Sequence, residues 1–360
     1  MTDLQTRPSP APGESITLTR PQLPGWAPAV AALVAFGLAA LVGLLLGWGP
    51  VPVVVVGWIL LVVALPAWST AVEGSRKGTD RLVTTVVWTT FAVAMMPLVA
   101  VIWEVVSRGA PALSVEFLTF SQDGVLGEGG GIYHAIMGTL IITAIATVIS
   151  VPIGVLAAIY LIEYGKGSRL ARVLTFLVDG MTGIPSIVAG LVALALYTLI
   201  FGPGTRMAIG GSIALSVLMI PIVVRATEEM LKLVPDELRE ASYALGVPKW
   251  RTITKVVLPT AIGGIITGVT LAVARVAGET APLLLIVGTL RSTNFNPFEG
   301  SMATLPVLIF SEATRGGLAE YVPFQVERAW GAALVLITIV MLLNVIARVL
   351  GSFFAPKTGR

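Results

Sequence analysis

The sequence contains no cysteine, one histidine and few charged residues. Of its 360 residues, 12% are charged and 56% are apolar, with a mean hydropathy of +0.91. The absence of cysteine excludes disulfides, thiol catalysis and thiolate metal sites, and a single histidine excludes a cluster of imidazole ligands. A soluble domain carries roughly 25% charged residues. Half of that share indicates a protein whose solvent is largely lipid.

Two classes of ligand site are also missing. The net charge is only +3, so the sequence offers no basic surface for nucleic acid. It lacks the Gly-x-x-x-x-Gly-Lys-Ser/Thr phosphate loop, so the chain cannot hydrolyse ATP by that route. The glycine-rich run at 127–131 follows no strand, and we interpret it as a flexible exterior loop rather than a phosphate cradle. His134, after this loop, is predicted to be a satisfied interfacial residue without a role.

Apolar runs long enough to cross a bilayer recur along the chain. A transmembrane helix needs about 20 mostly apolar residues. The predicted spans are 27–47, 51–68, 82–106, 136–162, 173–201, 208–225, 256–290 and 329–353. The sequence therefore predicts an all-α polytopic membrane protein with about eight spans.

Glycine and proline mark interruptions in this pattern. Gly49-Pro50 predicts a tight hairpin between the first two spans. The Gly183-Ile184-Pro185 step breaks the fifth run, so the first part of that run is predicted to lie at the membrane interface. Residues 303–311 are apolar but too few to span, and they predict a re-entrant or interfacial helix on the outer face.

The distribution of basic residues predicts the orientation. With the amino terminus inside, 17 of the 23 lysines and arginines fall in cytoplasmic segments and five in outer segments. Cytoplasmic loops carry such an excess of positive charge. We therefore expect a multi-pass plasma-membrane protein whose two termini and 226–255 loop face the cytoplasm. Residues 1–26, polar and proline-rich, are predicted to be a disordered cytoplasmic tail.

The loop at 231–251 is predicted to form two short helices along the membrane face. Pro235 and the acids after it favour a helix start, Gly246 favours its end, and Pro248 opens a second helix that contains Trp250. Apolar residues recur at helical spacing and predict one inward face: Leu231, Val234, Leu238, Ala241 and Leu245. The residues predicted to be more exposed are Glu237, Arg239 and Glu240.

A signature in this loop resembles the permeases of ATP-binding-cassette (ABC) importers. Glu240-Ala241-Ser242, three residues, Gly246, nine residues and then Val256-Val257-Leu258-Pro259 match the Glu-Ala-Ala…Gly…Ile-x-Leu-Pro coupling loop in both spacings. Ser242 and Val256 are mild departures from it. The resemblance implies that a separate ATP-hydrolysing subunit grips this loop. The residues implied to couple the two subunits are Glu240, Ala241, Ser242, Gly246 and Trp250.

Two charged residues fall inside the seventh apolar run. Arg275 lies about 24 Å of helix beyond Pro259, and Glu279 follows on the same face of a continuous helix. A charge at the bilayer centre costs about 2.5–3.5 kcal/mol on insertion scales, so we expect both to face the bundle interior or an aqueous path. Two interpretations remain open. The pair only fixes helix packing, or Arg275 binds an oxyanion through its planar donor fork and Glu279 tunes its strength.

Three further residues belong to this hypothesis. Thr280 adds a hydroxyl beside Glu279, and Pro282 is predicted to unwind the helix just beyond the charges. Arg225 closes the span before the loop. It is either an anchor at the positive inner surface or a residue at the inner mouth that passes the anion onward.

The run from Arg275 through Gly278-Glu279-Thr280-Ala281-Pro282 resembles the PstA-type permeases of phosphate-specific ABC importers, as does Gly-Gly-Ile-Tyr-His-Ala-Ile-Met-Gly-Thr at 130–139. The resemblance covers roughly 82–353. It implies a type I importer permease core of six helices at 82–353, with its transmembrane domain at about 136–350, preceded by an extra hairpin at 27–68. Among binding-protein-dependent permeases, this family implies phosphate as the cargo and alternating access as the mechanism.

The same resemblance implies the partners. These are a PstC-like permease, two copies of an ABC ATPase subunit, and an extracytoplasmic phosphate-binding protein. ATP and Mg would bind the ATPase, so no cofactor is expected in this chain, and the chain itself is not expected to be an enzyme. Import of another oxyanion, sulfate or molybdate, is the first alternative. A polytopic membrane enzyme is a second, although a single histidine and the lack of an intramembrane acid cluster count against it.

Overall fold

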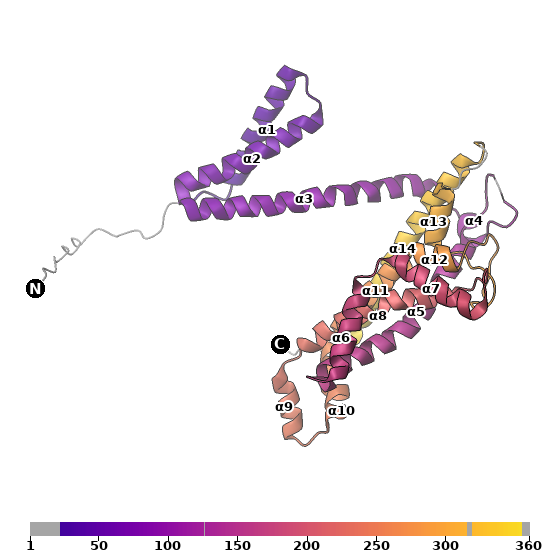
Figure 1. Cartoon of the computed structure of the whole chain (residues 1–360). Helices are drawn as coiled ribbons and strands as arrows, with labels where there is room; N and C mark the ends of the chain where they lie inside the picture. Colours follow the sequence, from indigo (N-terminus) through magenta and orange to yellow (C-terminus); the bar gives the residue numbers. More distant parts are fainter. Residues whose placement is uncertain (1–21, 126, 315–318, 355–360) are drawn as a thin grey trace, which may run out of the picture. The chain divides into compact units, whose positions relative to one another are not determined.

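The computed structural model describes residues 22–125, 127–314 and 319–354, so most of the predicted tail at 1–26 lies outside the described residues. Every regular element in these ranges is a helix, and the chain divides into two compact units, residues 1–101 and 102–360 (Figure 1). Seven helices in these ranges are long and apolar enough to cross a membrane, and a bent helix pair makes eight if it counts as one span. The predicted all-α polytopic fold with about eight spans is confirmed.

The first unit opens with a helical hairpin of α1 (Ala27–Leu46) and α2 (Pro50–Glu73). Its turn falls at the predicted Gly49-Pro50 step. The hairpin core joins Leu61 and Leu65 of α2 to a stripe of small residues on α1, spaced four apart. The buried members of that stripe are Ala27, Ala31, Ala35, Ala39 and Gly43. Small residues of this kind let two membrane helices approach closely.

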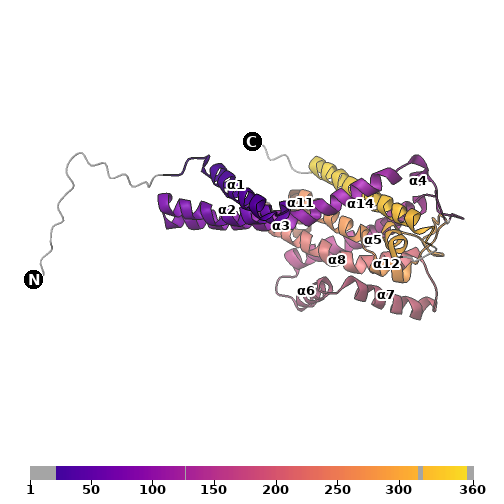
Figure 2. The ribbon, with the colours of Figure 1, turned by 90° about the horizontal axis from the view of Figure 1, so that it is seen from above.

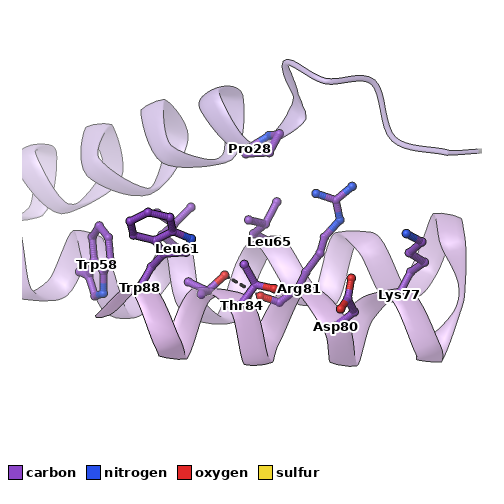
Figure 3. Close-up of a pocket in the computed structure, with 10 residues that line it drawn as sticks. Pro28, Trp58, Leu61, Leu65, Lys77, Asp80, Arg81, Thr84 and Trp88 are labelled. Atoms are coloured by element: carbon purple, nitrogen blue, oxygen red, sulfur yellow. Dashed lines mark hydrogen bonds between the residues drawn. The ribbon is translucent and has the colours of Figure 1, made fainter. Parts of the chain in front are cut away.

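A polar clasp joins α2 to the start of α3 (Ser75–Gly109) within the first unit. Arg81 Nε lies 3.0 Å from Glu73 Oε2, and Ser69 Oγ donates to the same oxygen at 2.5 Å. Beside the clasp lies a cavity of about 450 Å³ (Figure 3). It is lined by Pro28, Trp58, Leu61, Leu65, Lys77, Asp80, Arg81, Thr84, Thr85 and Trp88. An ion pair with a buried carboxylate thus supplements the apolar packing of this unit.

In the second unit, α5 (Tyr133–Ile159) and α8 (Ala208–Lys232) form the central helix pair. Serine hydroxyls cross their seam. The Ser212 hydroxyl lies 3.2 Å from the Ile142 carbonyl of α5 and equally far from the Ala208 carbonyl of its own helix. The Ser216 hydroxyl lies 3.4 Å from the Ala146 carbonyl of α5 and 2.8 Å from the Ser212 carbonyl of its own helix. Such interhelical hydrogen bonds between small residues are a common means of association in membranes.

Further long helices flank this pair. α11 (Leu258–Ala277) packs on α8 and on α14 (Val322–Phe354). α6 (Arg169–Thr182) and α7 (Ser186–Phe201) lie on the side of α8 away from α14 (Figure 2). The chain bends by 110° between α6 and α7, at the predicted Gly183-Ile184-Pro185 step.

Short elements and loops join the ends of these helices. α4 (Val115–Thr119) precedes α5, and α13 (Leu305–Thr314) is a short apolar helix packed on α14, in agreement with the prediction for 303–311. The glycine-rich run at 127–131 has no regular structure, as predicted of a loop. Arg328 of α14 nevertheless anchors it, because its Nη1 donates to the Gly127 carbonyl at 2.7 Å.

His134 departs from its prediction. Its side chain is buried in the first turn of α5, and neither ring nitrogen has a hydrogen-bond partner among the described residues. The prediction of a satisfied histidine therefore finds no support among the described residues. The sequence could not show this, because the packing of neighbouring helices decides which polar atoms reach the ring.

Candidate functional site

The charged loop at 231–251 folds as two short helices beyond the end of α8 (Figure 1). α9 (Asp236–Ala244) and α10 (Lys249–Thr252) each begin directly after a proline. Between them, Gly246 adopts a φ of 75°, a left-handed conformation that favours glycine. A π-helical turn (Ile253–Val257) then leads into α11. The predicted helix starts and the predicted turn at Gly246 are confirmed.

The apolar residues of this loop do not share one face. Leu231 and Val234 are buried around the end of α8, whereas Leu238 is exposed and Leu245 is 83% exposed. The break after α8 changes the helix axis between the two pairs, so the predicted single inward face is wrong. Trp250 on α10 is also exposed, by 57%. We refer to Leu238, Leu245 and Trp250 as the loop surface.

The signature residues divide between this exposed side and the interior. Glu240, Ala241 and Gly246 are exposed. Ser242 is buried, and its Oγ lies 2.8 Å from Thr252 Oγ1. Ser242 therefore holds α9 against α10, while its neighbours remain accessible.

Arg239 faces the protein rather than solvent, contrary to the prediction. Its side chain is only 12% exposed, and its Nη2 lies 2.9 Å from Glu163 Oε1. Glu163 belongs to a π-helical turn (Tyr160–Tyr164) at the end of α5. The guanidinium also donates to the carbonyls of Leu231 and Val234, at 2.9 and 2.6 Å. Periodicity could not show this, because the main acceptor comes from a remote part of the sequence.

The intramembrane charges are arranged differently from the prediction. Arg275 lies in the last turn of α11, which ends at Ala277, so Glu279 falls outside that helix. The Gly278 N–H donates to the Arg275 carbonyl at 3.3 Å and closes the last turn. Among the described residues, neither Arg275 nor Glu279 forms an ion pair with the other or with any third residue. The predicted shared helical face is therefore wrong.

The helix break falls between the two charges rather than beyond them. α12 (Ala281–Ile286) begins after Thr280, and Pro282 lies in its first turn, where a proline is tolerated. Arg275 is exposed in the single chain, while Glu279 and Thr280 are half-buried. The three residues are thus adjacent around one helix end but present no preformed pair.

Arg225 on α8 is bound by two carboxylates. Its Nη1 lies 2.6 Å from Glu228 Oε2, and its Nη2 bonds Asp179 Oδ1 of α6. The side chain also lines a cavity of about 540 Å³, together with both of these carboxylates and the basic residues Lys166, Arg172 and Lys232. Arg225 thus joins α8 to α6 at the edge of a basic cavity.

Arg225 and Arg275 do not form one site. Gly268 of α11 lies directly against Ala226 of α8, so Arg225 is level with Gly268. Arg275 lies two helical turns further along α11, about 10 Å away along the axis. Two positions along the helix bundle, rather than one, therefore carry the candidate arginines.

Sequence reasoning missed three acids that hold arginines of this region: Asp179 and Glu228 bind Arg225, and Glu163 binds Arg239. Glu163 and Glu228 are buried, and Asp179 is exposed. A signal was present, since each lies within or next to a predicted apolar span, where a carboxylate is costly unless paired. Glu228 lies three residues after Arg225 on the same helix, a spacing at which side chains pair, whereas the partners of Glu163 and Asp179 depend on tertiary packing.

Comparisons with known proteins agree on a family. The family model described as "Binding-protein-dependent transport system inner membrane component" matches residues 150–360. A Mycobacterium tuberculosis (H37Rv) protein named phosphate transport system permease protein PstA 1 is 48% identical over 288 residues, which cover 79% of this chain and 91% of the relative. The PstA protein of Pasteurella multocida is 39% identical over 285 residues, which cover 79% of this chain and 97% of the relative.

A solved structure shares the fold. A chain of a bacterial alginate ABC transporter, in complex with a periplasmic protein that holds an alginate pentasaccharide, matches with a TM-score of 0.52 at 15% identity. The match covers 78% of this chain and 97% of that one. The resemblance inferred from the signature residues is confirmed: this chain belongs to the family of binding-protein-dependent transport system inner membrane components and, within it, to the PstA-type permeases.

Proposed function

We propose that this chain is the permease subunit of an ATP-driven importer that moves inorganic phosphate into the cytoplasm by alternating access. The observation that carries this proposal is the 48% identity to a phosphate transport system permease over 91% of its length. The run from Arg275 to Pro282, which resembles that family, supports phosphate rather than sulfate or molybdate.

The loop surface supports docking of an ATPase subunit. Leu245 and Trp250 expose large apolar side chains beside the charged Glu240, and exposed apolar patches rimmed by polar residues commonly mark protein interfaces. The sequence contains no phosphate loop of its own. We therefore assign this surface to one of two ATPase copies, which would hold ATP and Mg and pull on the loop as they close.

The exposed face of α11 supports a transport pathway shared with a PstC-like permease. Thr267, Leu271 and Arg275 lie one turn apart and are exposed in the single chain. A guanidinium on an apolar helix is costly against lipid, so this face is proposed to meet the second permease and an aqueous path. Arg275 would bind phosphate through its planar donor fork, with Glu279 and Thr280 beside it.

The remaining assignments follow from charge. The excess of basic residues in alternate segments supports a plasma-membrane protein with both termini and the 231–251 loop in the cytoplasm. Arg225, at the edge of the basic cavity, would then lie near the inner mouth and pass the anion onward. On the opposite side, an extracytoplasmic phosphate-binding protein would deliver the substrate.

Replacing Arg275 tests the pathway. Charge-assisted hydrogen bonds are worth about 1.5–3 kcal/mol, so Arg275→Ala should lower ATP-driven phosphate uptake by at least about tenfold. Uptake of labelled phosphate into proteoliposomes holding the complete complex is the measurement. Arg348→Ala, which removes an exposed arginine from α14, is the matched control and should transport normally.

Normal phosphate uptake by an assembled Arg275→Ala complex would remove this residue from the pathway. Uptake of sulfate in preference to phosphate by the unmodified complex would instead favour the other oxyanions.

A further inference from the structure

Arg239 uses all three guanidinium nitrogens to hold separate parts of the chain. Its Nε and Nη2 lie 3.1 and 2.9 Å from Glu163 Oε1, at the end of α5. Nη2 also donates to the Leu231 carbonyl at 2.9 Å, and Nη1 donates to the Val234 carbonyl at 2.6 Å. Arginine presents five donors in a fixed planar fork. The side chain therefore joins α9 to both the end of α8 and the end of α5.

The same turn of α5 also receives α10. The Lys249 Nζ donates to the Glu163 main-chain carbonyl and lies 5.0 Å from the centre of the Tyr164 ring. The Glu163 side chain is only 5% exposed, and a low local dielectric strengthens a paired charge. Both helices of the 231–251 segment, which we call the coupling loop after its proposed role, are thus attached to one π-helical turn, Tyr160–Tyr164.

Chain connectivity explains why this attachment matters. The loop continues directly into α8 on one side and, through the π-helical turn at Ile253–Val257, into α11 on the other. α5 is remote in the sequence and is joined to α9 through the side chains of Glu163 and Arg239. Because α5 packs on α8 along the serine-bridged seam, moving the end of α5 with the loop would move the central helix pair as one body.

We propose that Arg239 is a positioning residue: paired with Glu163, it links α5 to the coupling loop, so that the ATPase moves α5, α8 and α11 together. This inference rests on the proposed function, because it assumes that an ATPase displaces the loop. It assigns Arg239 to force transmission rather than to docking, since its side chain points away from the loop surface.

The test is the amount of phosphate imported per ATP hydrolysed by the complete complex in proteoliposomes. Arg239→Gln and Glu163→Gln each break the pair, and coupling between sites commonly changes by about 1 kcal/mol, so the ratio should fall about fivefold in each. The double variant should match the single variants, because the interaction is already lost. Arg239→Lys, which keeps the charge without the fork, should also lower the ratio.

Two measurements separate transmission from a merely structural role. The ATPase subunit should co-purify with each variant in unchanged amounts. Arg348→Gln, which removes an exposed cation from α14, should leave the ratio unchanged. If either single variant fails to assemble, the double variant carries the test, because it leaves no unpaired buried charge.

An unchanged ratio in the assembled variants would overturn the inference, as would a double variant whose loss equals the product of the single losses. Failure of the proposed function would give a different result, because the unmodified complex itself would then show no ATP-dependent phosphate import.

Discussion

The arginines of the second unit differ in what surrounds each guanidinium. Arg239, Arg328 and Arg225 each bond to carboxylates, and the first two also bond to main-chain carbonyls. Arg275 has no such partner among the described residues and is exposed on an apolar helix. Arg239 and Arg328, whose guanidinium donors are occupied by carboxylates and carbonyls, can fix structure, whereas Arg275 keeps its donors available for an anion.

The buried pair of Arg328 and Glu312 predicts a stability effect at the residue scale. Arg328→Met leaves the buried Glu312 carboxylate without its partner, and breaking a buried pair costs about 3–5 kcal/mol. Arg328→Met with Glu312→Leu removes both charges and should cost much less. Thermal unfolding of the purified chain in detergent should therefore rank the single variant below the double.

Lys232→Gln is the control for that ranking. It breaks an exposed pair, which is worth about 0–1 kcal/mol, so its melting temperature should stay close to that of the unmodified chain. Equal melting temperatures for the single and double variants would contradict the assigned burial of the Arg328–Glu312 pair.

At the scale of elements, the coupling loop shows what local sequence signals can predict. Two prolines and Gly246 set where α9 and α10 begin and end, because they act through the backbone of their own turn. The direction of each helix face was not predictable, since it depends on acceptors such as Glu163. For the same reason, periodicity placed Arg239 outward when it points inward.

The end of α11 shows what local sequence signals cannot predict. Hydropathy is continuous across 256–290, so the sequence predicted one helix that carries both charges. The structure ends α11 at Ala277 and starts α12 at Ala281. Pro282 then packs directly against Gly190 of α7. This tertiary contact, which no local pattern encodes, accompanies the separation of Arg275 from Glu279.

Gly246 gives a prediction for the loop as an element. Its φ of 75° lies where a β-branched residue is strained, at a cost of order 1–3 kcal/mol. Gly246→Val should therefore distort the turn between α9 and α10 and lower the amount of ATPase subunit that co-purifies with the permease. Quantitative pull-down from detergent-solubilised membranes is the measurement.

The control for Gly246 is the same substitution in an open helix position. Gly37 on α1 has no atom near the place of an added Cβ, so Gly37→Val should co-purify the ATPase normally. Co-purification of Gly246→Val at the unmodified level, with normal transport-coupled hydrolysis, would count against the docking assignment.

At the scale of the whole molecule, the two units differ in how far their roles can be inferred. The second unit contains the coupling loop, both candidate arginines and all of the region matched by the family model, 150–360. The first unit has its own packed hairpin and clasp, but the sequence signatures for coupling and transport lie outside it. Composition and span length predicted the membrane fold because, in lipid, each spanning segment must satisfy its own backbone hydrogen bonds by forming a helix.

The central claim is that an external ATPase acts on the 231–251 loop of a phosphate permease. The most direct measurement is ATP hydrolysis by the complete complex in proteoliposomes, with the phosphate-binding protein present and phosphate added or withheld. We expect phosphate to stimulate hydrolysis several-fold and sulfate to have little effect. Hydrolysis that is indifferent to phosphate in a fully assembled complex would contradict the account.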